Sequence, residues 1–249
     1  MAQRNRPPDR DTAPAVQRLR LQYAKRGRLR FSSARDFQRA LERALRRADI
    51  PMAYSAGFSP HPKVSYTNSA PTGVASEAEY VEIGVVQQCD PEAVRMALDE
   101  ALPPGLDVVA CVEARTPDFA NRLEASIWRV ELPGVAPQDA QAALATFLAA
   151  DTVEVDRMTK NGRRTFDARG AVISAESVAA DTVDADCAIL TVVVRHGTPS
   201  VRPDDVLSAL HRVADLVPPK PPRVTRLAQG PLDEAGTSVT DPLAPDRVG

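Results

Sequence analysis

The sequence has 249 residues, of which 43% are hydrophobic and 26% are charged, and its formal net charge is −2 at pH 7. This apolar content is enough to bury a core, which excludes a wholly disordered chain. No run approaches the roughly 20 apolar residues of a membrane span, and the polar N-terminus lacks the apolar stretch of a secretory signal. We therefore expect a cytoplasmic protein without a membrane partner.

Positive charge is concentrated in the first part of the chain. Residues 1–70 contain 15 Lys and Arg against 5 Asp and Glu, whereas residues 71–249 contain 16 against 28. A split of this kind indicates that the N-terminal part meets a polyanion. The alternative is that a high-GC genome favours arginine codons and that the excess charge is merely solvated.

The cysteines and histidines are scattered. Cys89, Cys111 and Cys187 show neither C-x-x-C nor C-x-x-x-C-x-x-C spacing, so the sequence predicts neither disulfides nor an iron–sulfur cluster. His196 and His211 are expected at the surface, and no zinc site is predicted. The sequence also lacks a phosphate-binding loop, a dinucleotide fingerprint and a nucleophile elbow. We therefore predict no metal and no cofactor, and we do not predict an enzyme.

The ordered part is expected to begin near Val16. Residues 1–15 are polar and Pro-rich, which predicts a disordered tail. From Val16 to Tyr23 apolar and polar residues alternate, the period of a half-buried strand. After a turn at residues 25–27 the alternation resumes as far as Phe31, which predicts a bent strand or a hairpin.

A helix with one basic face is predicted next. Ser33 and Asp36 form a capping signature, and Pro51 ends the helix. Apolar residues recur every three or four positions on one side. The other side carries Arg35, Arg39, Arg43, Arg46 and Arg47. Guanidinium groups at this spacing can bind successive phosphates, so we predict an RNA-binding face; the alternatives are a solvated face or contact with an acidic protein.

The remaining elements complete a pattern that occurs twice. Extended pieces are predicted at 52–54 and 63–66 around a Gly/Ser/Pro loop. Strands are predicted at 79–86, 106–113, 125–132, 153–158, 172–178, 187–195 and 222–227, and helices at 91–102, 138–149 and 203–214. Asn161-Gly162 predicts a hairpin turn between 153–158 and 172–178. The fold class is therefore α+β, with two tandem ferredoxin-like (βαββαβ) units, 16–118 and 119–230, antiparallel sheets, and a disordered tail at 231–249. One continuous α+β domain with a long mixed sheet is the alternative.

The stretch between Arg28 and Val86 carries a family resemblance. It contains RALRRADIPMAYSAGFSPHPK and, further on, GVASEAEY. These motifs strongly resemble the radical-SAM-linked domain-of-unknown-function 2344 family. The resemblance implies a stand-alone accessory chain whose partner is a separately encoded radical-SAM enzyme. The family pattern has histidine where this chain has Ala34, so any acid–base role of that histidine is missing here.

The loop from Tyr54 to Lys63 is a second candidate for chemistry. Phe58 can stack on a base, and Lys63 can hold a phosphate. His61, with Tyr54 and Lys63, forms a weak candidate set of catalytic groups, because imidazole can move a proton near neutral pH. A rigid Pro-braced loop without a ligand is the alternative.

Three hypotheses follow. The first is an accessory RNA-binding protein that acts with the radical-SAM enzyme in RNA modification or processing. The second is a metal-independent enzyme that cleaves or modifies RNA with the Tyr54–Lys63 loop. The third is a protein-interaction subunit without RNA contact. The first hypothesis predicts that purified protein binds RNA without turnover, a result that neither of the other two hypotheses predicts.

Overall fold

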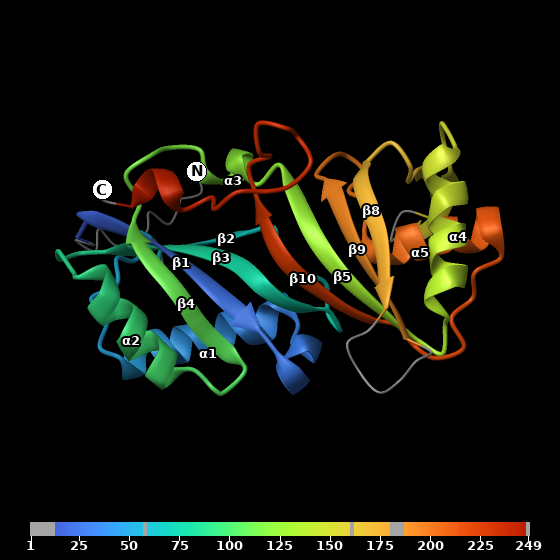
Figure 1. Ribbon diagram of the computed structural model, residues 1–249. Helices are drawn as coiled ribbons and strands as arrows, with labels where there is room; N and C mark the ends of the chain where they lie inside the picture. Colours follow the sequence, from blue (N-terminus) through green and yellow to red (C-terminus); the bar gives the residue numbers. More distant parts are fainter. Residues whose placement is uncertain (1–12, 57–58, 160–161, 180–186, 248–249) are drawn as a thin grey trace, which may run out of the picture. The chain divides into compact units, whose positions relative to one another are not determined.

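The chain forms two compact units in the computed structural model, which describes residues 13–56, 59–159, 162–179 and 187–247 (Figure 1). Unit 1 contains the chain up to Ala120 together with the C-terminal segment from Leu243, and unit 2 is Asn121–Pro242. Most of the tail predicted at 1–15 lies outside the described residues. The α+β class with mainly antiparallel strands is confirmed.

Unit 1 is built on one antiparallel sheet. Its strands in the described residues are β1 (Gln17–Lys25), β2 (Val64–Thr67), β3 (Ala75–Val85) and β4 (Leu106–Glu113), in the order β4-β1-β3-β2. Every neighbouring pair is antiparallel. Because side chains alternate along a strand, each of these strands sends one set of residues to each face of the sheet.

One face of this sheet holds the core of unit 1. Leu19, Leu21 and Tyr23 of β1 are buried there, and they pack with Ile83 of β3 and Leu98 of α2 (Pro91–Ala101). The helices α1 (Ala34–Arg47) and α2 cover this face (Figure 1). The other residues of β1, among them Arg18 and Arg20, therefore point to the opposite face, which we call the open face.

The helix α1 begins as its sequence predicts. Ser33 Oγ accepts from the Asp36 amide at 3.2 Å, and Asp36 Oδ2 accepts from the Ser33 amide at 3.1 Å, which is a capping box. The buried side of α1 consists of Phe37, Ala40, Leu41, Ala44 and Leu45. The Phe37 ring stacks on Tyr23 with 4.0 Å between centroids, so β1 fixes the rotation of α1 about its axis.

The prediction that the chain continues as a bent strand or a hairpin after residue 25 is wrong. Residues Gly27–Phe31 form a 3-10 turn, η1, and no residue of it is buried. Gly27 has φ 53°, a left-handed conformation that glycine adopts without strain and that breaks an extended strand. The alternation as far as Phe31 therefore does not reflect a strand with a buried side.

Unit 2 repeats the helix-and-strand order of unit 1, except that an additional hairpin of two strands, described below, lies between α4 and β8. After α3 (Phe119–Arg122) come β5 (Ala125–Pro133), α4 (Pro137–Ala149), β8 (Val172–Ala179), β9 (Cys187–Arg195), α5 (Pro203–Ala214) and β10 (Arg223–Gly230). The strand order is β10-β5-β9-β8, and each pair is antiparallel. Its buried strands are rich in Val, Ile and Leu, the residues that favour packed strands.

The predicted pairing around Asn161-Gly162 is wrong in its second strand. The strand β6 (Glu154–Thr159) pairs with β7 (Gly162–Asp167), which follows directly, whereas β8 pairs with β9. Only residues 160–161, which lie outside the described residues, separate β6 from β7, and so short a loop joins adjacent antiparallel strands. Asp167 then accepts from the amides of Val153 and Gly170, both at 2.9 Å, and turns the chain toward β8.

The prediction of a disordered tail at 231–249 is wrong for residues 231–247. Leu243 is fully buried, and the 3-10 turn η2 (Ala244–Asp246) places a buried Asp246 in unit 1. The buried Leu243 and the buried carboxylate of Asp246 with its cationic partner Arg20 hold the end of this segment, which has too few apolar residues for a hydrophobic pattern to reveal it. No helix in the described part of the chain is long and apolar enough to cross a membrane.

His196 follows β9 and is half-buried, which corrects its expected surface position. Its Nδ1 donates to the Leu123 carbonyl at 2.5 Å, since a carbonyl only accepts, and its Nε2 therefore accepts from the Ser126 hydroxyl at 2.7 Å. Burial lowers the pKa of His196 below its ordinary value, the bond to Leu123 opposes this, and the charge of Arg226 adds to it.

This lowered pKa predicts a loss of stability in mild acid. The contribution of His196 is fully present above the ordinary pKa near 6.5 and declines as pH falls toward the folded-state pKa. We expect the wild type to lose more free energy of unfolding between about pH 7.5 and pH 5 than His196→Asn does, as measured by urea denaturation. His211→Asn, at an exposed position, should retain the wild-type dependence. Identical pH profiles for all three proteins would contradict this account.

Candidate functional site

The outer side of α1 presents the predicted arginines to solvent. Arg35, Arg39, Arg43 and Arg46 are all exposed, and none of them forms an ion pair with any residue that the structure describes. They lie at i, i+4, i+8 and i+11, so they share the side of α1 that faces away from the core. We call these four residues the arginine face. Arg47 differs, because its Nη1 donates to the Ala101 carbonyl at 3.1 Å.

Two hydrogen bonds between Ser55 and His61 join the two sides of the loop between α1 and β2, and we call this place the neck of the loop. The Ser55 amide donates to the His61 carbonyl at 2.8 Å, and the His61 amide donates to Ser55 Oγ at 3.0 Å. Tyr54 and Pro62 form an isolated bridge beside them. These contacts fix the His61 backbone while its side chain stays exposed. Phe58, predicted to stack on a base, lies outside the described residues.

Two hollows adjoin this neck. The smaller, of about 160 Å³, is lined by Arg46 of α1 together with Tyr54 and His61. The larger, of about 480 Å³, is lined by His61 and Lys63 together with Arg18 of β1. The structure thus brings Arg46 to the loop, and it places His61 between the two hollows. Tyr54 and Lys63, predicted to act together with His61, line different hollows.

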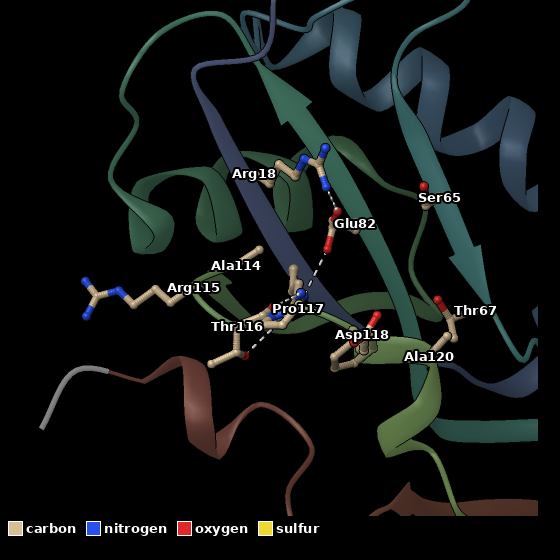
Figure 2. A pocket seen from close by; sticks show the side chains of 12 residues that line it. Arg18, Ser65, Thr67, Glu82, Ala114, Arg115, Thr116, Pro117, Asp118 and Ala120 are labelled. Carbon is tan, nitrogen blue, oxygen red and sulfur yellow. Dashed lines mark hydrogen bonds and ion pairs between the residues drawn. The ribbon is translucent and has the colours of Figure 1, made fainter.

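A third cavity, of about 710 Å³, lies on the open face of unit 1 (Figure 2). It is lined by Arg18 and Arg20 of β1, Ser65 and Thr67 of β2, Glu82 of β3, and residues 114–120. Sequence reasoning did not select these residues. The signal was present in the alternation of β1, where Arg18 and Arg20 alternate with the buried Leu19 and Leu21.

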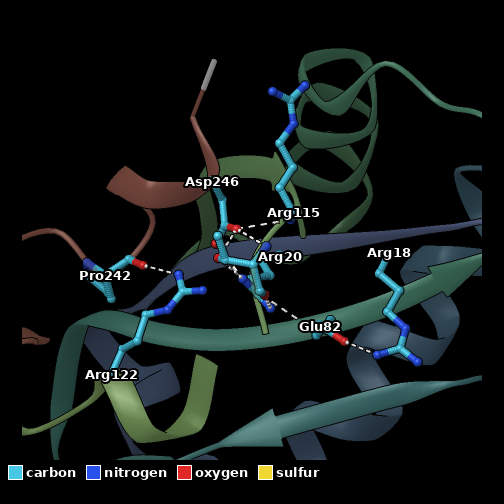
Figure 3. Close-up of polar contacts among 8 residues, drawn as sticks. Arg18, Arg20, Glu82, Arg115, Arg122, Pro242 and Asp246 are labelled. Atoms are coloured by element: carbon cyan, nitrogen blue, oxygen red, sulfur yellow. Dashed lines mark hydrogen bonds and ion pairs between the residues drawn. The ribbon is translucent and has the colours of Figure 1, made fainter. Parts of the chain in front are cut away.

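A buried ionic network fixes one end of this cavity (Figure 3). Arg20 Nη1 lies 2.5 Å from Asp246 Oδ2, and its Nη2 donates to the Thr116 carbonyl at 2.6 Å. Asp246 Oδ1 accepts from the amides of Arg115 at 3.0 Å and Thr116 at 2.9 Å. Arg20 Nε donates to Glu82 Oε2 at 3.0 Å, so the same guanidinium that anchors the C-terminal segment also orients Glu82.

The acidic residues of the GVASEAEY motif do not pair with the arginine face. Glu77 pairs with Arg26, which also contacts Asp107 at 2.8 Å. Glu79 is buried and accepts from the Ala70 amide at 2.9 Å. These two carboxylates therefore do not neutralise the helix arginines, which leaves the positive charge of α1 available to a ligand.

One tyrosine near the arginine face stays protonated at neutral pH. Tyr66 of β2 packs edge-on against Phe37 with 6.0 Å between centroids. Burial raises the pKa of Tyr66 to about 12, and the Glu42 carboxylate adds to the rise. The hydroxyl therefore offers a neutral hydrogen bond rather than a negative charge.

Within the described residues no group of three His, Cys, Asp or Glu side chains is arranged to hold a metal ion.

Comparison with protein-family models identifies a family. The model of the family described as "Uncharacterized protein conserved in bacteria (DUF2344)" matches residues 18–203, about three quarters of the chain. The match covers both units in large part, including the arginine face and the β6–β7 hairpin. No curated protein matches the sequence.

Proposed function

The chain belongs to the DUF2344 family, and from that premise we propose that it is an accessory RNA-binding protein that acts with a separate radical-SAM enzyme in RNA modification or processing. The observation that carries the proposal is the arginine face. Four exposed guanidinium groups on one helix side, none of which forms an ion pair among the described residues, attract a polyanion whose charges repeat along its length. Such contacts position a nucleic acid without reading its sequence.

We propose a ferredoxin-like fold for each unit. In unit 1 the elements follow the order βαββαβ, with the sheet order β4-β1-β3-β2. In unit 2, with the β6–β7 hairpin set aside, β5, α4, β8, β9, α5 and β10 follow the same order in a sheet ordered β10-β5-β9-β8. Equivalent strands thus occupy equivalent places. Other four-stranded α+β modules bind RNA, which supports the functional proposal by analogy alone.

The radical-SAM partner rests on the family resemblance. The sequence has no C-x-x-x-C-x-x-C triplet to bind the cluster of such an enzyme, so a second chain would supply that chemistry. The role left to this protein is to hold the RNA. The enzymatic alternative requires Tyr54, His61 and Lys63 to act on one substrate. No hydrogen bond joins their side chains within the described residues, although His61 is shared by both neighbouring hollows.

Crosslinking in cells followed by identification of RNA and protein tests the proposal. We expect the tagged protein to recover RNA and a radical-SAM enzyme, and the purified protein to bind the recovered RNA without changing it. Recovery of the enzyme without RNA would favour a protein-interaction subunit. Turnover by the purified protein that is lost in His61→Ala would favour the enzymatic alternative. Recovery of neither RNA nor enzyme would overturn the proposal.

A further inference from the structure

The three hollows of unit 1 are linked by shared residues. The hollow beside Arg46 and the hollow beside Lys63 both have His61 and Pro62 in their walls. The hollow beside Lys63 in turn shares Arg18, Ser65 and Glu82 with the cavity on the open face. The three hollows therefore adjoin one another in a row, which we call the depression and which leads from the end of α1, past the neck of the loop and the start of β2, to the open face.

Cationic side chains line this depression from one end to the other. Arg46 stands at its beginning, Lys63 and Arg18 at its middle, and Arg115 at its far end. The Arg18 side chain is 70% exposed, and its ion pair with Glu82 is long, at 3.5 Å. Both features leave Arg18 able to turn to a phosphate. The depression thus extends the positive charge of the arginine face to the open face.

Two carboxylates, those of Asp118 and Glu82, line the cavity, and Glu82 is the one that a buried arginine orients. Its Oε2 is held by the buried Arg20 at 3.0 Å, whereas its Oε1 has only the 3.5 Å contact with Arg18. A carboxylate repels phosphate, so the group that meets Glu82 must be a hydrogen-bond donor. The amino groups of adenine, cytosine and guanine are such donors. Uracil has one N–H between two carbonyl oxygens, and a carboxylate repels those oxygens.

We propose that the RNA is single-stranded where it crosses the open face, and that one amino-bearing base enters the cavity and donates to Glu82 while its flanking phosphates lie at Arg18 and Lys63. This inference rests on the proposed function, and it adds that the RNA bound by the protein is single-stranded at this site. Ser65 and Thr67 line the same cavity (Figure 2). Their hydroxyls offer hydrogen bonds to the ribose or to the base edge. In an A-form duplex the free amino hydrogen of a paired adenine or cytosine lies in a deep, narrow groove that side chains do not reach, so the base that meets Glu82 must be unpaired.

The test compares RNA probes of about 12 nucleotides, a length within the usual range of single-strand binding sites. The probes are alternating cytidine and adenosine, oligo-uridine, and the first probe annealed to its complement. The proteins are the wild type, Ser65→Trp, which fills the cavity, and Arg18→Gln. Arg28→Gln, an exposed arginine outside the three hollows, is the matched control. Thermal unfolding of each variant establishes that it is folded.

We expect the wild type and Arg28→Gln to bind the cytidine–adenosine strand about tenfold more tightly than oligo-uridine. Ser65→Trp and Arg18→Gln should lose this preference and bind both strands weakly, while their affinity for the duplex, held by the arginine face, changes less than twofold. Equal binding of all probes by every folded protein would overturn this inference and leave the proposed function standing. Failure of the wild type to bind any probe would overturn both.

Discussion

Replacing Arg35, Arg39, Arg43 and Arg46 together by glutamine will weaken RNA binding by a factor on the order of 100 to 1000 at about 100 mM salt. The expectation follows from counterion release, in which each neutralised phosphate contributes a salt slope of about 0.7 to 0.9. Glutamine forms helices about as well as arginine, and these side chains make no ion pair within the described structure. The fold and stability of unit 1 should therefore be retained.

A control variant with the same change in net charge shows whether RNA binding depends on contacts of the arginine face or on the net charge of the whole protein. Arg164, Arg195, Arg212 and Lys220 are exposed in unit 2, and the structure gives none of them an ion pair among the described residues. Their replacement by glutamine should weaken RNA binding by less than about threefold, because screening limits their reach at this salt. Fluorescence anisotropy with one labelled RNA measures both variants. Equal losses would show that net charge alone attracts RNA.

Asp246→Ala will strongly destabilise unit 1. The carboxylate of Asp246 is 1% exposed and pairs with the buried Arg20, and it also accepts from the amides of Arg115 and Thr116. Removing one partner of a buried ion pair leaves the other charge uncompensated and costs about 3 to 5 kcal/mol. For a chain of this size the loss corresponds to a fall in melting temperature on the order of 10 °C, which calorimetry measures.

Two comparisons sharpen this prediction. Glu234→Ala removes an exposed carboxylate from the same C-terminal region and should change the melting temperature by less than about 2 °C. Deletion of residues 243–249 removes both Asp246 and the buried Leu243, and should destabilise at least as much as Asp246→Ala. A deletion that unfolds at the wild-type temperature would mean that the segment is a dispensable tail.

Most elements of the fold are predictable from local patterns. The capping box at Ser33 and the alternation around Leu19 and Leu21 each follow from contacts within a few residues. The predictions of secondary structure fail where contacts between residues distant in the sequence determine the structure. The segment after residue 25 follows the left-handed Gly27 rather than its alternation. Residues 243–247 are held by the ion pair between Arg20 and Asp246, whose partners are 226 positions apart, and the Leu232 amide donates to the distant Glu124 carboxylate.

The candidate site likewise has one part that the sequence predicts and one part that it does not. The exposure of the arginine face follows from helical periodicity, so the sequence predicts it directly. The cavity on the open face depends on which strands are neighbours, since Arg18, Ser65 and Glu82 meet only because β1 and β2 both pair with β3. No spacing in the sequence reveals this arrangement. An isolated charged residue between buried ones indicates only that a strand has a second, polar face.

The salt dependence of RNA affinity tests the central claim most directly, because it counts the phosphate contacts that a variant loses. The affinity of the wild type and of the variant with glutamine at Arg35, Arg39, Arg43 and Arg46 is measured across a range of salt concentrations. We expect the slope of log affinity against log salt to be shallower in the variant by about 3. Equal slopes for the two proteins would show that these guanidinium groups do not contact phosphates.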